Sequence, residues 1–451
     1  LKANMGAYLA QFAPHIPWIG TTMAPGLYDI PVMHVLIDGV YTHTVPVDAY
    51  RGAGRPEAAY VIERLADEAA RVMGVSPADI RRLNFVKPEQ MPYRTAAGRT
   101  YDTGEFEGHM NRALEVADYA GFPAREAESR ARGRLRGIGI SSYIEACAFP
   151  GSEIAEVMLG EDGTVTLLIG TQSIGQGHAT AYGQIIADRL GIGMDRIRVI
   201  QGDTDLVKTG GGTGGSRSVP LGAPSVLSAS DTLAAQLKEL AADELEAAAD
   251  DLELADGTVR VVGTDRAVSL AALAGKAADK SKLKASGRVK QTEPTFPNGT
   301  HVCELEIDPT TGVTTILRYV IVDDFGVTVN PRLLAGQVHG GVVQGIGQAL
   351  LENTVYDADG QLVTASMLDY ALPRADDVPF FHFETRNVPS THNPLGIKGA
   401  GEAGTIGACA AVMNAVVDTL WRNHGIRHLD MPVTPDRMWA AIEGASRTAA
   451  E

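Results

Sequence analysis

The sequence contains few cysteines, and they follow no pairing pattern. Cys147, Cys303 and Cys409 are its three cysteines, and no Cys-x-x-Cys spacing occurs. Such widely separated cysteines encode neither a disulfide framework nor an iron–sulfur motif. Any electron-transfer cluster that works with this chain is therefore expected on another chain.

Basic charge and long apolar runs are scarce as well. The 39 Lys and Arg are outnumbered by 55 Asp and Glu, which gives a formal net charge of −16, and no basic tract stands out. The apolar stretches fall short of the roughly 18 residues that span a bilayer, and residues 1–20 lack the basic start of a secretory signal. We therefore expect no nucleic-acid partner, no membrane span and a cytoplasmic location.

Glycine, by contrast, is abundant. The 451 residues include 50 glycines, although glycine costs backbone entropy on folding unless the chain must bend sharply or approach another group closely. The glycines cluster between apolar segments, which indicates loops built for close approach. The length is sufficient for two or three packed domains.

Apolar periodicity predicts a multidomain α+β fold with mixed sheets. Residues 56–73 repeat apolar side chains at helical spacing and end at Gly74, and Ser76 can cap a second helix with Asp79 as its acidic partner. Strands, glycine-rich loops and helices then alternate, and a β-hairpin follows. The other predicted elements are strands at 165–169 and 196–200, helices at 179–190, 223–249, 333–352 and 406–420, and a hairpin of 303–307 with 313–322.

Two stretches of unusual composition suggest how the chain divides. Residues 276–298 are rich in Ala, Lys and Ser with little apolar periodicity, which predicts an exposed connection between lobes. Residues 125–136 are dense in charge and carry no aromatic side chain, although a solvated helix face would look the same. We therefore expect three parts, at 1–130, 131–290 and 291–451.

Five glycine-containing segments carry the candidate binding residues. Glycine-rich loops that lead into helix N-termini commonly bind phosphate, because backbone amides can approach an anion there. Each segment alone also has an ordinary explanation: a loop before a helix, a tight turn with a surface histidine, a flexible linker, close helix packing or a helix start. A guanidinium in the third segment favours anion binding. The candidates are Arg51, Gly52, Ala53, Gly175, Gln176, Gly177, His178, Thr213, Gly214, Gly215, Ser216, Arg217, Gln337, Lys398, Gly399, Ala400 and Gly401.

Glu402 is the candidate catalytic residue. It follows the glycine-rich segment 396–401 and precedes an apolar helix, a place where a carboxylate is unusual. The helix dipole favours the ionised carboxylate, whereas burial raises its pKa, and the sequence leaves open which effect dominates. In either case the group can act as a base.

In their order along the chain, the five segments resemble those of the molybdenum hydroxylases, the family of xanthine dehydrogenase and aldehyde oxidase. The resemblance covers nearly the whole chain and matches the C-terminal part of the molybdopterin-binding large subunit. It implies that Arg51, Gln176, residues 213–217 and Gln337 surround a molybdenum–molybdopterin, in bacteria usually the cytosine dinucleotide form. It also implies that residues 398–401 aim a Glu402 base, and that no protein side chain ligates the metal.

The resemblance further implies an oxidoreductase that hydroxylates an aldehyde or an N-heteroaromatic substrate with water as the oxygen source. Glu402 would take the proton of a metal-bound hydroxide while hydride passes to the cofactor. Electrons would then pass to [2Fe–2S] and FAD on partner subunits of a hetero-oligomer, dimerised or not. The alternatives are a reductive or dehydrogenating member of the family, and a non-catalytic cofactor-binding or assembly half, against which an intact Glu402 argues.

Three departures from the family pattern shape these expectations. The glycine- and phenylalanine-rich cofactor motif, which the family carries in the first half of the subunit, does not occur in this sequence. We therefore expect an N-terminal half elsewhere, as a separate gene product, a cleavage product or sequence absent here. Residues 50–54 hold no cysteine, unlike the Mo–Cu carbon monoxide dehydrogenases, which disfavours carbon monoxide oxidation. Ala53 stands where xanthine dehydrogenases usually have phenylalanine, which disfavours a strict xanthine pocket unless Phe149 compensates.

Overall fold

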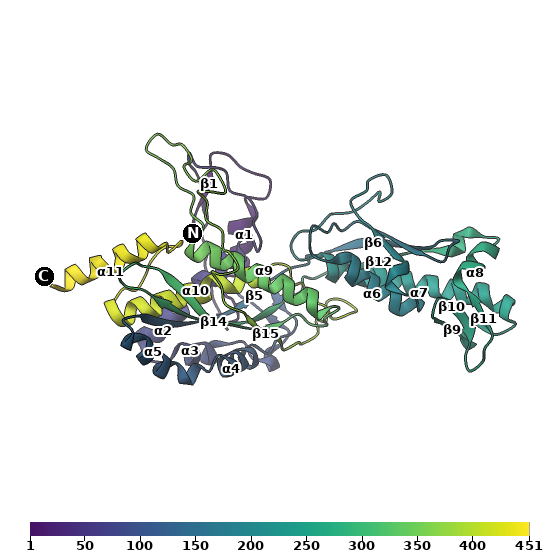
Figure 1. The fold of residues 1–451 in the computed structure, drawn as a ribbon, viewed down its shortest axis with the longest axis horizontal. Helices are drawn as coiled ribbons and strands as arrows, with labels where there is room; N and C mark the ends of the chain where they lie inside the picture. The colour runs from purple at the N-terminus through teal and green to yellow at the C-terminus, as the bar shows by residue number, and fades with distance from the viewer. Residues whose placement is uncertain (451) are drawn as a thin grey trace.

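The chain forms two bodies that lie side by side in an elongated molecule (Figure 1). The computed structural model describes residues 1–450, with side chains described as far as residue 446. Each body has its own four-stranded sheet, and smaller two- and three-stranded sheets lie outside them. The α+β fold class expected from the alternating sequence patterns is confirmed.

The sheet of the first body has the strand order β15-β14-β13-β5. β13 (Asn298–Ile307) pairs antiparallel with both β5 (Leu135–Ile144) and β14 (Thr314–Asp324), and β15 (His382–Thr385) runs parallel to β14. The predicted β-hairpin is therefore confirmed. All residues of β13 are buried, because helices cover both faces of this central strand.

Helices pack on the two faces of this sheet in separate groups. α10 (Ala403–His424) lies against β5 and β13 on one face, and α9 (Pro331–Leu350) and α2 (Arg55–Met73) pack on α10. α4 (Phe106–Val116) and α5 (Phe122–Ala131) cover the other face. As a result, the N-termini of α2 and α10 come together at one end of the first body.

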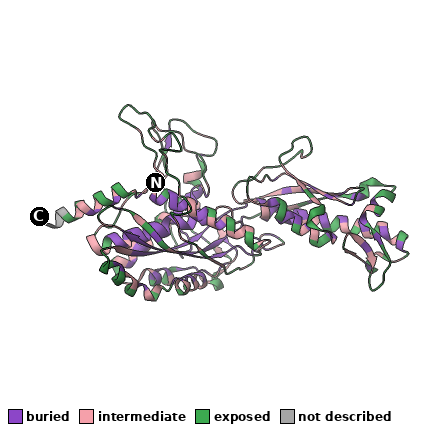
Figure 2. Cartoon of the chain, in the orientation of Figure 1, coloured by how far each residue is buried: buried purple, intermediate pink, exposed green. Residues whose placement is uncertain are grey.

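α10 is the central core helix of the first body. Gly139 of β5 allows it to approach the sheet, because a Cβ there would lie 2.3 Å from the Ala411 carbonyl oxygen. Within residues 1–450, α10 is the one helix whose length and composition would allow it to cross a membrane. Polar residues such as Asn414 and Asp418 interrupt its apolar runs. However, 94% of its most apolar window is buried inside the protein, as the colouring of Figure 2 also shows. Such burial is typical of a core helix.

The sheet of the second body has the strand order β12-β6-β7-β8. β6 (Gly151–Leu159) pairs antiparallel with β7 (Val165–Ile169) and with β12 (Lys284–Gln291), and β8 (Ile197–Ile200) runs parallel to β7. The helices α6 (His178–Leu190) and α7 (Ser218–Leu245) enclose an apolar core with this sheet. The predicted succession of strand, glycine-rich loop and helix is confirmed twice here.

The predicted long helix is confirmed as α7, whose bounds are 218 and 245 where the sequence predicted about 223 and 249; Pro220 lies in its first turn and Pro224 inside it. One prediction for the second body is wrong. Residues 276–298 are not an exposed connection, since they contain β12, which pairs along its whole length with β6. A Cβ at Gly287 would lie 2.1 Å from the Ser225 carbonyl oxygen of α7, so β12 lacks the bulky inner residues that would have revealed a strand.

The pairing of β5 bears on where the parts of the chain begin. β5 falls within the part expected at 131–290 but pairs with β13, which falls in the part expected at 291–451. The pairing favours a middle part that begins after Ile144 and ends before Asn298. The three-part division itself stays a prediction.

The remaining elements are peripheral. α2 ends at Gly74 in the left-handed conformation, and the Ser76 hydroxyl accepts from the Asp79 N–H at 3.0 Å to cap the next helix, as predicted. The other helices are α1 (His15–Met23), α3 (Pro77–Asn84), α8 (Leu270–Lys276) and α11 (Pro435–Ala450). The other strands are β1 (Lys2–Gly6), β2 (Asp38–Tyr41), β3 (Tyr93–Arg94), β4 (Thr100–Tyr101), β9 (Leu252–Ala255), β10 (Thr258–Val261) and β11 (Ala267–Ser269). Short 3-10 helices lie at Pro88–Gln90, Tyr119–Gly121, Met194–Arg196, Ala249–Asp251 and Lys280–Leu283.

Candidate active site

Glu402 lies at the N-cap of α10, where donors from two segments converge on its carboxylate. Its Oε1 accepts from the Gly52 N–H at 2.9 Å and from Arg55 Nη2 at 2.7 Å, and its Oε2 accepts from the Ser216 hydroxyl at 2.8 Å. The side chain is 13% exposed. Burial alone would raise its pKa, but the Arg55 guanidinium and these hydrogen bonds hold the pKa of Glu402 below its ordinary value. The question that the sequence left open is thus decided in favour of the ionised form.

Arg55, at the start of α2, is a functional residue that the sequence reasoning missed. Its Nη1 donates to the Ala146 carbonyl at 2.7 Å, its Nε donates to the Gly52 carbonyl, and its Nη2 holds Glu402. The guanidinium is almost fully buried, and the nearby carboxylates keep the pKa of Arg55 above its ordinary value despite that burial. The available signal was a second arginine in the same glycine loop as Arg51.

Ser216 reaches Glu402 from the second body. Its φ of +52° is in the left-handed region, which a non-glycine residue adopts at a cost and which directs the hydroxyl toward the carboxylate. Gly399 makes room for this contact, since a Cβ there would lie 2.4 Å from the Ser216 carbonyl oxygen. A Cβ at Gly401 would lie 3.2 Å from the Ser216 hydroxyl. Glycines in the segment before Glu402 therefore allow the two bodies to meet there.

Glu145 is a second carboxyl group at this place, and the sequence reasoning also missed it. It is fully buried just beyond β5, and the same Ser216 hydroxyl lies 3.3 Å from its Oε1. Burial, and next the charge of Glu402, raise the pKa of Glu145 well above its ordinary value. The only signal in the sequence was a glutamate directly after a strand that ends in Tyr143 and Ile144.

Arg51 ties the loops around the site together. Its guanidinium donates to the Gln337 carbonyl at 2.9 Å, to Gln344 Oε1 at 2.9 Å and to the Gly401 carbonyl. These bonds join the loop before α2 to α9 and to the segment that carries Glu402. The Arg51 guanidinium is therefore engaged with protein oxygens, and its place beside the cofactor stays a prediction.

The glycine-rich loops of the second body are brought together beside α6 and α7. The Thr213 hydroxyl donates to the Gln172 carbonyl at 2.6 Å and lies 2.7 Å from the Ser218 hydroxyl, which joins the two loops. His178, the first residue of α6, is buried and not at the surface, so its interpretation as a surface histidine is wrong. Burial lowers the pKa of His178 to about 4, which keeps the imidazole neutral.

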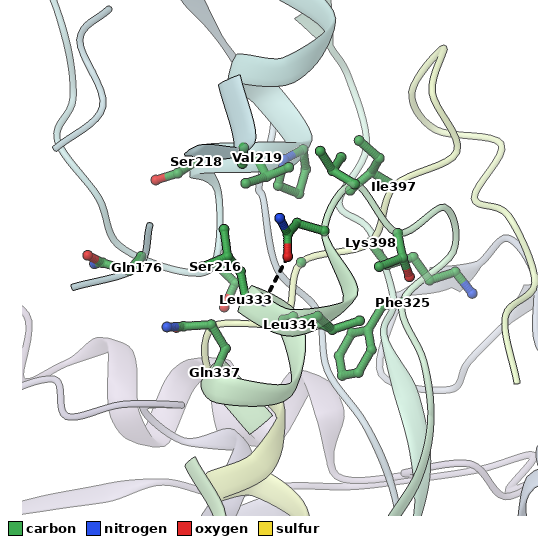
Figure 3. A pocket seen from close by; sticks show the side chains of 18 of the residues that line it. Gln176, Ser216, Ser218, Val219, Phe325, Leu333, Leu334, Gln337, Ile397 and Lys398 are labelled. Atoms are coloured by element: carbon green, nitrogen blue, oxygen red, sulfur yellow. Dashed lines mark hydrogen bonds between the residues drawn. The ribbon is translucent and has the colours of Figure 1, made fainter. Parts of the chain in front are cut away.

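A cavity between the two bodies is lined by nine of the predicted binding residues (Figure 3). Loops of the second body supply one wall, and α9 with the segment before Glu402 supplies the other. Loops that are far apart in the sequence thus face one space. The predicted residues that line the cavity are Gln176, His178, Thr213, Ser216, Gln337, Lys398, Gly399, Ala400 and Gly401.

Other predicted residues border the site without lining this cavity. Gly52 donates to Glu402, and the Gly215 carbonyl accepts from the Ala148 N–H at 2.8 Å. Arg217 turns its guanidinium toward Glu153, 3.4 Å away, and toward the Gly212 carbonyl. The remaining predicted residues that do not line it are Arg51, Ala53, Gly175, Gly177 and Gly214.

The ammonium group of Lys398 is directed away from the cavity. Figure 3 shows it pointing away from Gln176, Ser216 and Gln337, and its Nζ bonds Asp324 Oδ2 at 2.5 Å with both side chains fully buried. Lys398 therefore contributes only its other atoms to the cavity wall. The buried ion pair anchors the segment that leads to Glu402.

The lining of the cavity is mainly apolar, with a few polar groups. Among the described residues that line it there is no carboxylate, and hydroxyls, glycine-rich backbone and two glutamine side chains lie among apolar side chains such as Phe325, Leu333 and Leu334. Such a lining suits a ligand with an apolar body and a few polar atoms. The Gln337 amide has no hydrogen-bond partner within the described part of the chain, so it is free to bind a ligand. Within residues 1–450 no cluster of three His, Cys, Asp or Glu could hold a metal ion.

Known proteins match this arrangement. Two family models described as molybdopterin cofactor-binding domains match residues 112–379 and 1–85. The chain belongs to the molybdenum hydroxylase family. The family expected from the sequence is thereby confirmed.

Relatives of this molybdenum hydroxylase chain are longer than the chain itself. It is 35% identical to the nicotine 6-hydroxylase large subunit of Paenarthrobacter nicotinovorans and 34% identical to the carbon monoxide dehydrogenase large chain of Hydrogenophaga pseudoflava. These matches cover 95% and 93% of this chain but 55% of each relative. The solved structure of quinoline 2-oxidoreductase from Pseudomonas putida 86 superposes with a TM-score of 0.89 at 33% identity, covering 98% of this chain and 59% of the other. The chain thus spans a little over half the length of its relatives.

Proposed function

We propose that this chain is the base-carrying, C-terminal part of a molybdenum hydroxylase subunit that hydroxylates an N-heteroaromatic or aldehyde substrate with oxygen from water. The observation that carries the proposal is the state of Glu402. Its carboxylate is held ionised by Arg55, Gly52 and Ser216 at the edge of a cavity whose lining combines apolar side chains with a few hydroxyl and amide groups. A buried, ionised carboxylate beside a ligand cavity is what a general base requires.

The cofactor proposed for the cavity is molybdenum–molybdopterin in its cytosine dinucleotide form. Gln176 and Gln337 would hold its polar atoms, Thr213 would keep the neighbouring loops joined through its bond to the Gln172 carbonyl, and the backbone of residues 399–401 would pass close to it. When bound, this cofactor supplies the two-electron oxidation and activates water. The ligands of the metal would come from the cofactor and from solvent, with no protein side chain among them.

Glu402 supplies the proton acceptor in this proposal. Replacing a substrate C–H by C–OH with oxygen from water releases two electrons and two protons, and Glu402 takes one of the protons. Arg55 and Gly52 hold its carboxylate in one orientation, so that it meets the reacting groups without rearrangement. The electrons would pass to [2Fe–2S] and FAD on partner subunits.

The N-heteroaromatic substrate class has the stronger support. Two relatives are named for nicotine and quinoline, which are N-heteroaromatic compounds. Phe149 is half-buried beside Gly215, and Arg99 stacks over its ring at 5.4 Å, so an aromatic side chain borders the site although Ala53 has none. Such a ring can stack on a flat substrate.

Carbon monoxide oxidation is supported less well. Relatives named carbon monoxide dehydrogenase are similarly close, yet the loop before α2 has no cysteine. Cys147 lies under Gly399, where its thiol faces Thr295 at 3.3 Å, and burial raises its pKa well above the ordinary value. A buried, protonated thiol is a poor metal ligand.

The proposal includes partners and a location. A [2Fe–2S] subunit, an FAD subunit and, where it is a separate chain, the N-terminal half of the molybdenum subunit would complete a cytoplasmic hetero-oligomer, which accords with relatives named as subunits or large chains.

The test is Glu402→Gln in the purified complex that contains this chain, with molybdenum and pterin measured alongside turnover of an N-heteroaromatic such as quinoline. We expect stoichiometric molybdenum in both proteins and a loss of at least about 100-fold in kcat in the variant. Metal-free wild-type protein, or a variant with full turnover, would refute the proposal.

A further inference from the structure

The buried carboxyl group of Glu145 has few hydrogen-bond donors around it. Glu145 and Glu402 share a single serine hydroxyl, which lies 2.8 Å from Glu402 and 3.3 Å from Glu145. A serine has one O–H to donate, and the shorter distance gives it to Glu402. Glu145 is therefore left without that donor.

Arg55 does not serve Glu145 either. Its Nε, Nη1 and Nη2 donate to the Gly52 carbonyl, the Ala146 carbonyl and Glu402 respectively. Glu145 Oε2 has no hydrogen-bond donor within the described residues, although the group is fully buried. An ionised carboxylate is unfavourable in such a place, because burial removes its hydration and no donor replaces it.

A proton on Glu145 removes this difficulty. We propose that Glu145 is a positioning residue, a neutral carboxylic acid at neutral pH that donates its O–H to the ionised carboxylate of Glu402. The pair then carries one negative charge, on Glu402, the carboxylate that Arg55 contacts directly at 2.7 Å. The inference rests on the proposed function only in taking Glu402 as the base.

The groups around the pair agree with this assignment. Burial and the neighbouring charge of Glu402 both raise the pKa of Glu145, and hydrogen bonding between the two carboxyl groups raises it further. The same contact helps to lower the pKa of Glu402. The titratable and charged groups that act on Glu145 from the surrounding elements are Glu402, Arg55, Arg51, Cys147 and Tyr143.

Infrared difference spectroscopy of the purified complex at pH 7 tests the protonation state without turnover. We expect a carboxylic-acid C=O band in the wild type that is missing in Glu145→Gln and shifted in Glu402→Gln, where the acceptor becomes an amide. Glu306→Gln is the control, because Ser129 and Arg132 hold the pKa of Glu306 below its ordinary value, so its removal leaves the acid band in place. Identical acid bands in the wild type and Glu145→Gln would overturn the proposal.

The pH profile of kcat/KM tests the positioning role. Glu145→Gln keeps a side chain of the same length with a hydrogen-bond donor, so the fall of its kcat/KM at low pH should coincide with that of the wild type. Glu145→Leu has no donor, so the fall should begin at a higher pH, and kcat/KM should be about tenfold lower than in the wild type at the acidic end. A fall that moves to lower pH in Glu145→Gln would mean that a negative charge had been removed, which contradicts a neutral Glu145. If Glu402→Gln keeps full turnover while the infrared band behaves as expected, the proposed base fails and the protonated Glu145 stands.

Discussion

Replacement of Arg55 by methionine tests how Glu402 is kept ionised. At 2.7 Å and an effective dielectric constant of about 20, the gross attraction between the two charges is about 6 kcal/mol. Part of this only offsets the desolvation of two nearly buried ions, so breaking the pair should cost about 3–5 kcal/mol. Without Arg55, burial becomes the dominant effect on Glu402, and its pKa rises.

The sign of the pH effect follows from the direction of that shift. In the wild type the pKa of Glu402 is lowered in the folded state, so its ionised form contributes stability above its unfolded pKa, and this contribution is lost as pH falls through the folded pKa. In Arg55→Met the decline of kcat/KM with falling pH, about tenfold per pH unit, should begin at a higher pH.

The assay is kcat/KM of the purified complex as a function of pH, with circular dichroism to establish that each variant is folded. Arg55→Lys keeps the charge but cannot make all three hydrogen bonds, so it should recover part of the wild-type profile. Arg71→Met is the control on the same helix, since Arg71 pairs with Glu68 near the surface and that pair contributes about 1 kcal/mol or less. An acidic limb that is the same in Arg55→Met and Arg71→Met would refute the reasoning.

Two further predictions concern the loops around the cavity. Gly399→Ala should displace the segment before Glu402, because its Cβ would lie 2.4 Å from the Ser216 carbonyl oxygen, and this displacement should lower kcat about 100-fold. Gly275→Ala is the control, since a Cβ there meets nothing within 4 Å, and it should leave turnover unchanged. Equal activities of the two variants would contradict this prediction. Burial lowers the pKa of His178 to about 4 in the folded protein, whereas the pKa in the unfolded chain is about 6.5. As pH falls from about 6.5 through 4, the unfolded chain therefore binds a proton that the folded protein does not, and the free energy of unfolding should decrease by up to about 3 kcal/mol. The hydrogen–deuterium exchange protection factors of α6, which correct for the pH dependence of intrinsic exchange, should therefore fall over this range in the wild type, and a His178→Gln variant with the same fall would exclude the histidine as its cause.

The sequence predicted the parts of the site that have a distinctive local pattern. Glycine-rich segments before helices are visible in the sequence, and they led to Glu402 and to the nine residues that line the cavity. Arg55 was missed because an arginine in the first turn of a helix resembles any surface residue, and only the folded chain shows that it is buried. Glu145 was missed because the group that makes it important, Glu402, is far away along the chain.

β12 illustrates the same limit for the fold. Strand prediction depends on bulky apolar residues at alternate positions, but close packing against α7 requires small residues such as Gly287 on the inner face of β12. The segment therefore had the composition of an exposed linker. The information that it is a strand is contained in α7 and β6, with which it packs.

The two bodies contribute different properties to the site. Arg55, Gly52 and Glu402 all belong to the first body, so the ion pair that lowers the pKa of the base is complete within it. Ser216 and the loops of Gln176 and Thr213 belong to the second body, which supplies one hydroxyl to Glu402 and one wall of the cavity. A movement between the bodies would therefore change how a cofactor is placed more than it would change the charge of the base. Variants of Arg55 should accordingly alter the pH profile, whereas variants of the second-body loops should alter cofactor content.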